Sequence, residues 1–483
     1  MMKLYSTLDR EVVQIKPLVD NTISIYNCGP TVYFNMHIGN IRAYINWDIL
    51  YRAFLYLGYD VNRVMNLTDV GHMTADEDFG EDKIEKSASS EGVKPIEIAN
   101  RYIRSVLADF RKMNILSPSG EEIDPNMDLG KLKEIGFLRA TEYINEMIEM
   151  IKKIEKNGYA YETKQALYFD ISKIPDYTIF TGQSLDEKAE GVREEVNVDP
   201  DKHHPADFVL WMKRVGKYEN HIMHWKSPWG DGFPGWHIEC SAMGTTVLGD
   251  KFDIHTGGID NMSVHHPNER AQNIGTYGRP VVSYWIHNEW VVMGDDSKMS
   301  KSSGKSFLLE DILKMGFNPL DLRYLYSSVK YNMKLNFSKE ALEGARNSRL
   351  ALINRLTELK KKSSGQDGKI LPSYVKKFKE YLDDCLNISK VLALINEIIK
   401  SNEKPEDILT TIYDFDRVLG LDLEVSLVEN GLSIPDSVLE LVEKREEARK
   451  GKNFKLADSL RDQIMNMGYR VVDTSDGFNI EEI

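Results

Sequence analysis

The stretch from residue 27 to residue 40 constrains the fold most, because it joins two predicted elements of secondary structure. An alternating run at 23–26 precedes it and predicts a strand. A helical pattern follows it and ends near Gly58. A second strand is predicted at 61–65. The order strand, helix, strand predicts a parallel sheet, in which ligands bind at the carboxyl ends of the strands.

Three residues at the start of the predicted helix suit a phosphate group. His37 and Asn40 have side chains that donate hydrogen bonds, and helix N-terminal amides attract anions. Gly39 lacks a side chain, so a nucleotide can lie close to the backbone. A His-x-Gly-Asn sequence alone also occurs in ordinary loops, so it is weakly specific. Thr68 ends the second strand, where it is either a ligand contact or a satisfied strand-end hydroxyl.

A second motif, from Lys298 to Ser302, changes the interpretation of the first. Together, residues 37–40 and 298–302 resemble the HIGH and KMSKS signatures of class I aminoacyl-tRNA synthetases. The sequences at 236–243 and at 255–269 are similar to those of cysteinyl-tRNA synthetases. The likeness extends from residue 27 to the region 468–479, so it covers nearly the whole chain.

The length of 483 residues predicts several domains. We expect an α/β protein whose doubly wound, Rossmann-like parallel-sheet catalytic domain is split by an insertion. A helical-bundle domain and a small C-terminal α/β domain follow it. The expected ranges are 1–116 and 226–297 for the two catalytic halves, 117–225 for the connective insertion, 298–339 for the KMSKS loop and stem-contact region, 340–430 for a helical tRNA-binding bundle and 431–483 for an anticodon-binding domain. Within the insertion, the pattern predicts an amphipathic helix at 141–156 and a hairpin at 159–170.

Composition narrows the class of protein. Hydrophobic residues make up 42% and charged residues 28%, which suits a soluble enzyme. No apolar run is long enough to span a bilayer, and the first eleven residues lack the apolar core of a signal peptide. The three cysteines are widely spaced, so we expect a reducing cytoplasm and no disulfide framework.

The net charge of -14 argues only weakly against a nucleic-acid partner, because local patches count more than the total. Lysines and arginines cluster at 360–379 and at 444–461. These clusters are either tRNA contacts or solvated helix faces, and the sequence leaves both interpretations open.

Four residues are candidate metal ligands: Cys28, Cys240, His265 and Glu269. Two thiolates, an imidazole and a carboxylate suit zinc, but no Cys-x-x-Cys pair is present and each residue has an ordinary structural interpretation. The resemblance implies that all four bind one zinc ion. Pro267 predicts a helix that starts at that residue, so that His265 precedes it and Glu269 lies in its first turn.

Cys385 is the remaining cysteine, and it is expected in a helical stretch at 381–388 with a structural role.

The resemblance also implies a reaction. ATP activates L-cysteine to cysteinyl-adenylate, and the cysteinyl group then passes to the 3′ end of tRNA(Cys). Phosphate contacts would come from His37, Asn40, Lys298 and Lys301, and Mg²⁺ would accompany ATP. The second histidine of the family signature is Asn40 here, which donates hydrogen bonds but cannot become cationic. Contacts to the amino acid are expected from Thr68, Trp236, His237, Asp260 and His266. A monomer is the family expectation.

Three alternatives remain open. A tRNA-free cysteine ligase would share both signatures and the zinc ligands, but it would have little use for the C-terminal helical region. A small nucleotidyltransferase would not need Cys240 and His265. A non-enzymatic, tRNA-binding zinc protein would not need the motif from Lys298 to Ser302.

Overall fold

Five parallel strands form the central sheet, in the order β12-β11-β3-β4-β5. They are β3 (Thr22–Asn27), β4 (Asp60–Leu67), β5 (Phe137–Arg139), β11 (Phe252–Gly258) and β12 (Val282–Asn288). The chain moves outward from β3 to β5 and then returns to the other side of β3 with β11 and β12. This reversal is the switch point of a doubly wound, Rossmann-like sheet. The predicted fold class is confirmed, as are the strands predicted at 23–26 and 61–65.

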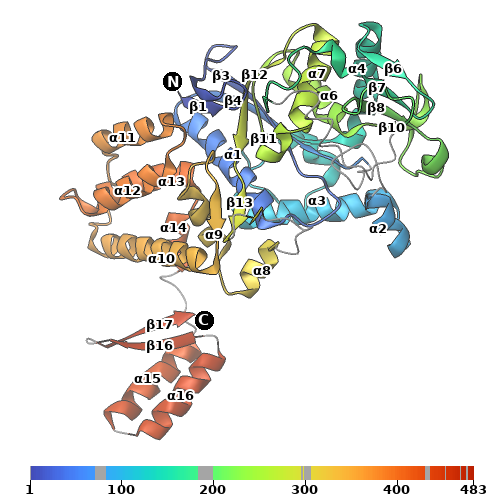
Figure 1. Ribbon diagram of the computed structural model, residues 1–483. Coiled ribbons are helices and arrows are strands. Elements are labelled where there is room, and N and C mark those ends of the chain that lie inside the picture. The colour runs from blue at the N-terminus through green and yellow to red at the C-terminus, as the bar shows by residue number, and fades with distance from the viewer. Residues whose placement is uncertain are drawn as a thin grey trace.

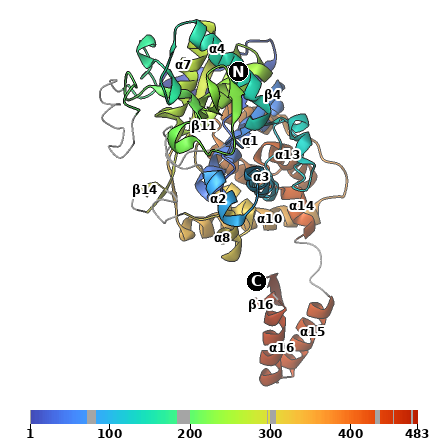
Figure 2. The ribbon, with the colours of Figure 1, turned by 90° about the vertical axis from the view of Figure 1, so that its right-hand side faces the viewer.

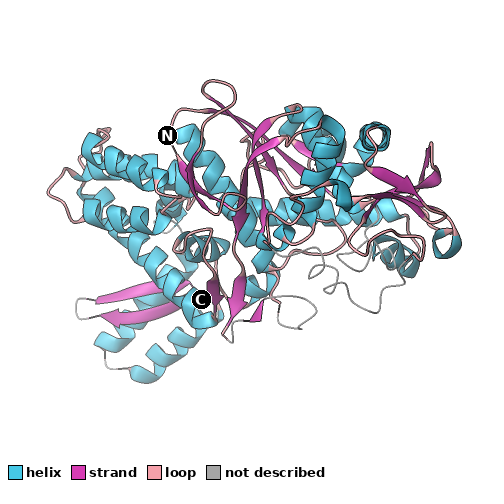
Figure 3. Ribbon diagram, turned by 45° about the horizontal axis from the view of Figure 1, so that its top comes forward, coloured by secondary structure: helices cyan, strands magenta, loops and turns pink. Residues whose placement is uncertain are grey.

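Helices cover both faces of this sheet in the computed structural model, which describes residues 2–70, 83–182, 199–294, 297–298, 306–429, 436–451, 453–467, 469–474 and 477–482. Two of them, α1 (Ile38–Tyr56) and α3 (Pro95–Lys112), share one hydrophobic core with Ile25 of β3. On the other face, α6 (Trp236–Leu248) and α7 (His265–Tyr277) share a second core with Tyr26 of the same strand. Because side chains alternate along a strand, these two cores lie on opposite sides of the sheet. Figure 3 shows helices on both sides of the strands.

A second, mainly antiparallel sheet lies at the upper right of Figure 1. Its strands, in the order β6-β7-β8-β10-β9, are β6 (Ala160–Glu162), β7 (Ala166–Phe169), β8 (Phe208–Lys213), β10 (Gly230–Pro234) and β9 (Trp225–Ser227). The predicted hairpin is β6–β7, and the predicted amphipathic helix is α4 (Ile144–Lys156). Strand β5 lies inside the range 117–225 but pairs with β4 of the central sheet, and β9 and β10 continue the second sheet to residue 234.

Helices of the C-terminal half pack against α1 rather than forming a separate core. They are α8 (Leu309–Lys314), α9 (Pro319–Ser327), α10 (Lys339–Lys362), α11 (Pro372–Asp383), α12 (Ile388–Ile399), α13 (Pro405–Leu419) and α14 (Leu423–Glu429). Apolar residues from 309 to 423 belong to the same core cluster as those of α1. A small sheet of β13 (Val291–Met293), β14 (Ser297–Lys298) and β15 (Leu335–Phe337) connects this region to the end of β12.

The last elements form a unit with its own apolar clusters. They are α15 (Asp436–Lys450), α16 (Phe454–Asn466), β16 (Tyr469–Thr474) and β17 (Gly477–Glu482), and Figures 1 and 2 show them packed together. The remaining elements are β1 (Lys3–Ser6), β2 (Glu11–Gln14) and α2 (Lys83–Glu91). Across the described ranges, no helix combines the length and apolarity that crossing a membrane requires.

The prediction that Cys385 lies in a helix is wrong. Helix α11 ends at Asp383 and α12 begins at Ile388, and Cys385 between them has a φ of 54°. Its backbone N–H donates to Lys3 O at 3.2 Å, so pairing with the N-terminal strand draws the chain out of the helix. The side chain is buried in the core.

Candidate active site

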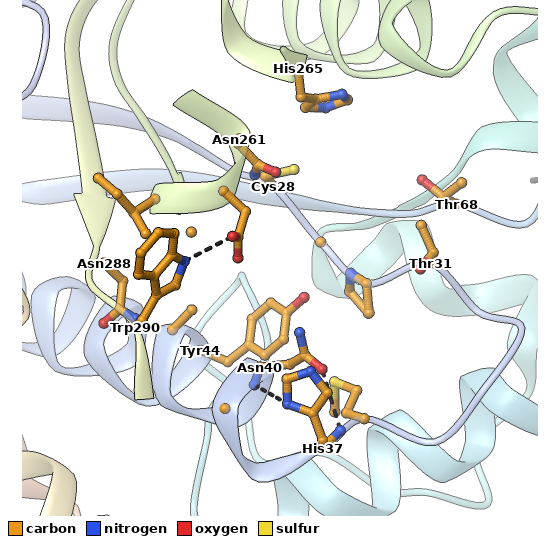
Figure 4. A pocket seen from close by; sticks show the side chains of 18 of the residues that line it. Cys28, Thr31, His37, Asn40, Tyr44, Thr68, Asn261, His265, Asn288 and Trp290 are labelled. Atoms are coloured by element: carbon orange, nitrogen blue, oxygen red, sulfur yellow. Dashed lines mark hydrogen bonds between the residues drawn. The ribbon is translucent and has the colours of Figure 1, made fainter. Parts of the chain in front are cut away.

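A pocket of about 320 Å³ opens at the switch point of the sheet. Six segments line it: the turn after β3, the start of α1, the end of β4, the start of α6, the turn from β11 to the start of α7, and the end of β12 with the residues after it. Figure 4 shows Cys28 and His265 at one end of the pocket and His37 with Asn40 at the other. Two groups predicted to have different chemistry therefore face one cavity.

His37 and Asn40 hold each other at the start of α1. The side chain of His37 caps the helix, because its Nδ1 accepts a hydrogen bond from Asn40 N at 3.2 Å. Asn40 Oδ1 accepts from His37 N at 3.3 Å in return. Since Nδ1 is an acceptor, the neutral imidazole carries its proton on Nε2, which makes Nε2 a donor. The pair thereby keeps both helix-start side chains in fixed orientations.

Close packing brings the turn after β3 to the end of β4. Gly29 N donates to Asn66 Oδ1 at 2.6 Å, and a Cβ on Gly29 would lie 1.7 Å from Asn66 O. Only glycine fits this approach, which places the neighbouring Cys28 at the pocket.

Three of the four predicted metal ligands form one group. The ligand atoms of Cys28, Cys240 and His265 all lie within 4.8 Å of one another. They come from the turn after β3, from α6 and from α7. Glu269 falls in a second group, with His255 and His266, that shares no residue with the first. It still reaches the first group, because its Oε1 lies 3.1 Å from His265 Nε2.

Two buried atoms show that a cation fits this group. His265 Nε2 and Glu269 Oε1 make no hydrogen bond within the part of the chain that the structure describes. Unsatisfied buried polar atoms are costly, and one metal ion would satisfy both. The donor set of two sulfurs, one imidazole nitrogen and one carboxylate oxygen suits zinc.

The members of this group shift one another's pKa values. Burial would lower the pKa of His265, but Glu269 and Cys240 raise it to about 10. Burial would raise the pKa of Glu269, but His255 and His265 lower it to about 2. Burial and the neighbouring Cys28 raise the pKa of the Cys240 thiol. His265 and Glu269 thus favour each other's charged forms.

The predicted start of the helix that carries Glu269 is wrong. Helix α7 begins at His265, so His265 and Glu269 are four residues apart on one helix face. Pro267 is its third residue. Proline is tolerated there because the first N–H groups of a helix have no partner inside it. A shared helix face, rather than the first turn alone, places the two ligands.

Two predicted substrate contacts lie behind the metal group rather than on the pocket. His237 Nδ1 is 2.8 Å from His265 Nδ1, and only 2% of His237 is exposed. His266 is fully buried and hydrogen-bonds His287 at 2.7 Å. Neither residue lines the pocket. On Glu269, the second oxygen contacts His255 Nε2 at 2.9 Å, so outer histidines orient the ligands.

The other predicted contacts line the pocket. Thr68 Oγ1 donates to Glu239 Oε2 at 2.9 Å. The ring of Trp236 lies over that of His265, with centroids 4.4 Å apart. Asp260 Oδ1 accepts a hydrogen bond from Trp290 Nε1 at 2.8 Å.

Sequence reasoning missed the pocket wall at 288–291, which includes Trp290. These residues follow β12 directly, so the rule that ligands bind at carboxyl ends of strands could have found them. The backbone of Lys298 lies in β14, paired with Val292. Lys301 lies outside the described residues.

The comparisons with known proteins agree with one another. Residues 14–347 match the family model described as the tRNA synthetases class I (C) catalytic domain. A cysteine–tRNA ligase of Treponema denticola is 41% identical, with 97% of this chain and 96% of the relative covered. Cysteine–tRNA ligase 1 of Burkholderia lata is 36% identical, with 99% and 96% covered. Methionyl-tRNA synthetase of Mycobacterium tuberculosis, in complex with methionyl-adenylate, shares the fold at 14% identity, with a TM-score of 0.54 and 83% and 90% of the two chains covered. The chain belongs to the cysteine–tRNA ligase family of class I tRNA synthetases.

Proposed function

We propose that the protein activates L-cysteine with ATP and transfers it to the 3′ end of tRNA(Cys). The observation that carries this proposal is the single pocket that joins a thiol-containing metal group to a helix start of the HIGH type. The first suits a substrate with a thiol, and the second suits a nucleotide phosphate. The names of the full-length relatives agree with this activity.

The reaction has two steps. In the first, a carboxylate oxygen of cysteine attacks the α-phosphorus of ATP, and the bond to the β-phosphate oxygen breaks to release pyrophosphate. In the second, a hydroxyl of the terminal tRNA ribose attacks the cysteinyl carbonyl, and AMP leaves. Negative charge develops on the α-phosphate oxygens in the first step, so donors placed in advance accelerate it.

The residues around the pocket would divide this work between them. His37 would donate from Nε2, with Asn40, Lys298 and Lys301 as further phosphate contacts and Gly39 allowing close approach of ATP. Magnesium would enter with ATP.

Contacts to the amino acid would come from Thr68, Trp236 and Asp260, with Asp260 facing the ammonium group. His237 and His266 would act from behind, by orienting the metal ligands.

Cys28, Cys240, His265 and Glu269 would hold one zinc ion. When bound, zinc would take the substrate thiolate as a further ligand and lower the pKa of its thiol. Serine offers only a neutral hydroxyl, so this site would select cysteine without a separate editing domain.

The remaining regions would serve tRNA. Residues 298–339 would contact the acceptor stem, 340–430 would form a tRNA-binding helical region and 431–483 would read the anticodon. We place the catalytic halves at 1–116 and 226–297 with the insertion between them, in a cytoplasmic monomer. The lysine clusters at 360–379 support the assignment of the helical region, because phosphate contacts need cations.

One experiment separates this function from its alternatives. We expect ATP–pyrophosphate exchange with cysteine and not with serine or methionine, followed by charging of tRNA(Cys). Exchange without charging would favour a tRNA-free cysteine ligase. Exchange that does not depend on an amino acid would favour another nucleotidyltransferase, and tRNA binding without exchange would favour a non-enzymatic protein.

A further inference from the structure

Arg42 is a buried arginine on α1, the helix that starts at the pocket. Its guanidinium donates to four main-chain oxygens. Nη1 donates to Glu289 O and Trp290 O, both at 2.9 Å. Nη2 donates to Lys330 O at 3.1 Å and to Met333 O at 2.7 Å. One side chain thereby joins α1 to the residues just before β13 and to those just before β15.

This arrangement is costly, which points to a purpose other than stability alone. Burial lowers the pKa of Arg42 to about 10, and its hydrogen-bond acceptors among the described residues are all main-chain oxygens. Arg323, another fully buried arginine, differs in pairing with the carboxylate of Asp48 at 2.6 Å. A buried cation that lacks such a pair pays more for desolvation. Its multiple donors in a rigid plane suit it to hold carbonyl groups in place.

The held segment is part of the pocket. Residues 288–291, here called the pocket wall, line the cavity opposite Thr68, as Figure 4 shows. Leu335 N donates to Trp290 O at 3.0 Å, which ties the wall to β15. From the wall, Trp290 Nε1 reaches Asp260 Oδ1 at 2.8 Å. The wall thereby holds a hydrogen bond to Asp260, a solvent-exposed carboxylate that lines the pocket.

We propose that Arg42 is a positioning residue that fixes the pocket wall, and with it Trp290 and Asp260, relative to His37 at the start of α1. The consequence for the reaction rests on the proposed function. ATP at the start of α1 and the amino acid beside Asp260 must meet in one geometry. A shift of the wall relative to the helix lowers turnover, because small misplacements of bound reactants cost rate even when binding persists.

Arg63 provides a matched control. It is a buried arginine whose guanidinium also donates only to main-chain oxygens, those of Trp47 and residues 116–118. Burial likewise lowers its pKa to about 10, although the charge of the nearby Asp48 opposes that shift. None of these residues lines the pocket. Arg42→Lys and Arg42→Met are compared with Arg63→Lys and Arg63→Met in the full-length, zinc-loaded protein.

The first measurement is amide hydrogen exchange, which does not depend on any activity. In Arg42→Lys we expect faster exchange in peptides covering 288–293 and 330–335, by roughly tenfold or more, because the wall opens more often. In Arg63→Lys we expect the faster amide hydrogen exchange in peptides near 116–120 instead. An unchanged rate of amide hydrogen exchange at 288–293 in both Arg42 variants would overturn the proposal.

The second measurement is cysteine-dependent pyrophosphate exchange. We expect kcat to fall at least about tenfold in Arg42→Lys and further in Arg42→Met, with KM for cysteine within about threefold. The zinc content should stay equal to that of the wild-type protein, and the Arg63 variants should keep their kcat. Trp290→Phe removes the indole donor to Asp260, so Arg42→Lys should slow that variant less than it slows the wild-type protein.

The two measurements fail in distinguishable ways. A folded Arg42→Met protein with wild-type kcat would overturn the proposal, and so would equal losses in the Arg42 and Arg63 variants. If the wild-type protein showed no cysteine-dependent pyrophosphate exchange, the proposed function would fail. The hydrogen-exchange result would then still decide whether Arg42 holds the wall.

Discussion

His37 and Asn40 each cap the other, and this limits what either can offer to a phosphate. The Nδ1 of His37 and the Oδ1 of Asn40 are both occupied as acceptors at the start of α1. The cap uses only these acceptors, so the side-chain N–H donors of both residues take no part in it. The replacement of a second signature histidine by Asn40 retains a helix cap and removes a possible positive charge.

Two substitutions of Asn40 separate its capping role from its charge. Asn40→Asp keeps an oxygen that accepts from His37 N, and a carboxylate stabilises a helix start by about 0.3–1 kcal/mol. The same charge repels phosphate, so the rate of cysteine-dependent ATP–pyrophosphate exchange should fall at least about tenfold. The midpoint of thermal unfolding should not fall. Asn40→His can become cationic and should stay within about threefold of the wild-type rate or exceed it. A loss in Asn40→His as large as in His37→Ala would contradict this account.

Lys301→Ala tests the second signature. We expect adenylate formation to slow more than cysteine binding weakens, because a phosphate contact strengthens as charge develops in the transition state. Single-turnover rates and equilibrium binding of cysteine give the two quantities. Lys305→Ala, four residues further along the chain, serves as the control for removing a nearby lysine. Unchanged exchange in Lys301→Ala would exclude its proposed role.

At the residue scale, sequence reasoning predicted which candidate residues gather at the pocket but not their neighbours. Cys28, Cys240 and His265 come together as the resemblance implies. The capping role of His37 was missed, because histidine is not among the usual N-cap residues. The wall at 288–291 was missed because nothing in its composition marks it. Its position at the carboxyl end of β12 is the signal that could have found it.

At the scale of elements, strands and helices with strong periodicity could be predicted, whereas their ends could not. Helix α7 begins two residues before Pro267 because proline is tolerated throughout a first turn. The helix predicted across Cys385 is interrupted because the backbone N–H of this residue donates a hydrogen bond to Lys3, which is remote in sequence, instead of continuing the helix. Both errors arise where tertiary contacts override a local pattern.

A buried ion cluster joins α1 to α9 and predicts a pH-dependent stability. Burial alone would raise the pKa of Asp48, but Arg52, Arg323 and Arg63 lower it below its ordinary value. A lowered pKa stabilises the fold above the unfolded-state pKa of about 4, and this contribution is lost as the pH falls through the folded-state pKa. Asp48→Asn should therefore cost about 3–5 kcal/mol at pH 7, and the difference from wild-type should shrink below about pH 4.

Urea unfolding followed by tryptophan fluorescence at several pH values measures this difference. Asp250→Asn is the control, because Asp250 pairs with Arg279 at an exposed site. This substitution should lower the free energy of unfolding by less than about 1 kcal/mol. A stability difference between wild-type and Asp48→Asn that stays constant from pH 7 to pH 3 would contradict the assignment.

At the scale of the molecule, shared cores decide where the chain can be divided. The apolar residues of α9–α14 belong to the core cluster of α1, so a cut at residue 338 would expose a hydrophobic interior. Among the described residues, the clusters built from residues 436–482 contain no side chains from elsewhere. The proposed division of the chain into a first half for the chemistry and a second half for tRNA is therefore not also a division of the fold.

Truncation after Glu429 removes the C-terminal unit, which has its own apolar clusters, and leaves the core shared with α1. The shortened protein should fold and keep its rate of cysteine-dependent exchange within about threefold, because every pocket residue remains. Charging of tRNA(Cys) should fall at least about tenfold, because phosphate contacts would be lost. Charging at the full rate would show that residues 430–483 do not bind tRNA.

The central claim is that a metal held by Cys28, Cys240, His265 and Glu269 selects cysteine through its thiol. Cys28→Ser and Cys240→Ser should lose metal and cysteine affinity together, whereas Cys385→Ser should lose neither, since that cysteine lies in the core away from the group.

Ultraviolet absorption of the cobalt-substituted protein tests the claim most directly. We expect a new thiolate-to-cobalt band on adding cysteine, and none on adding serine, because soft thiolate binds such a metal far better than a neutral hydroxyl. An unchanged spectrum with cysteine, or full discrimination against serine by a metal-free protein, would contradict the claim.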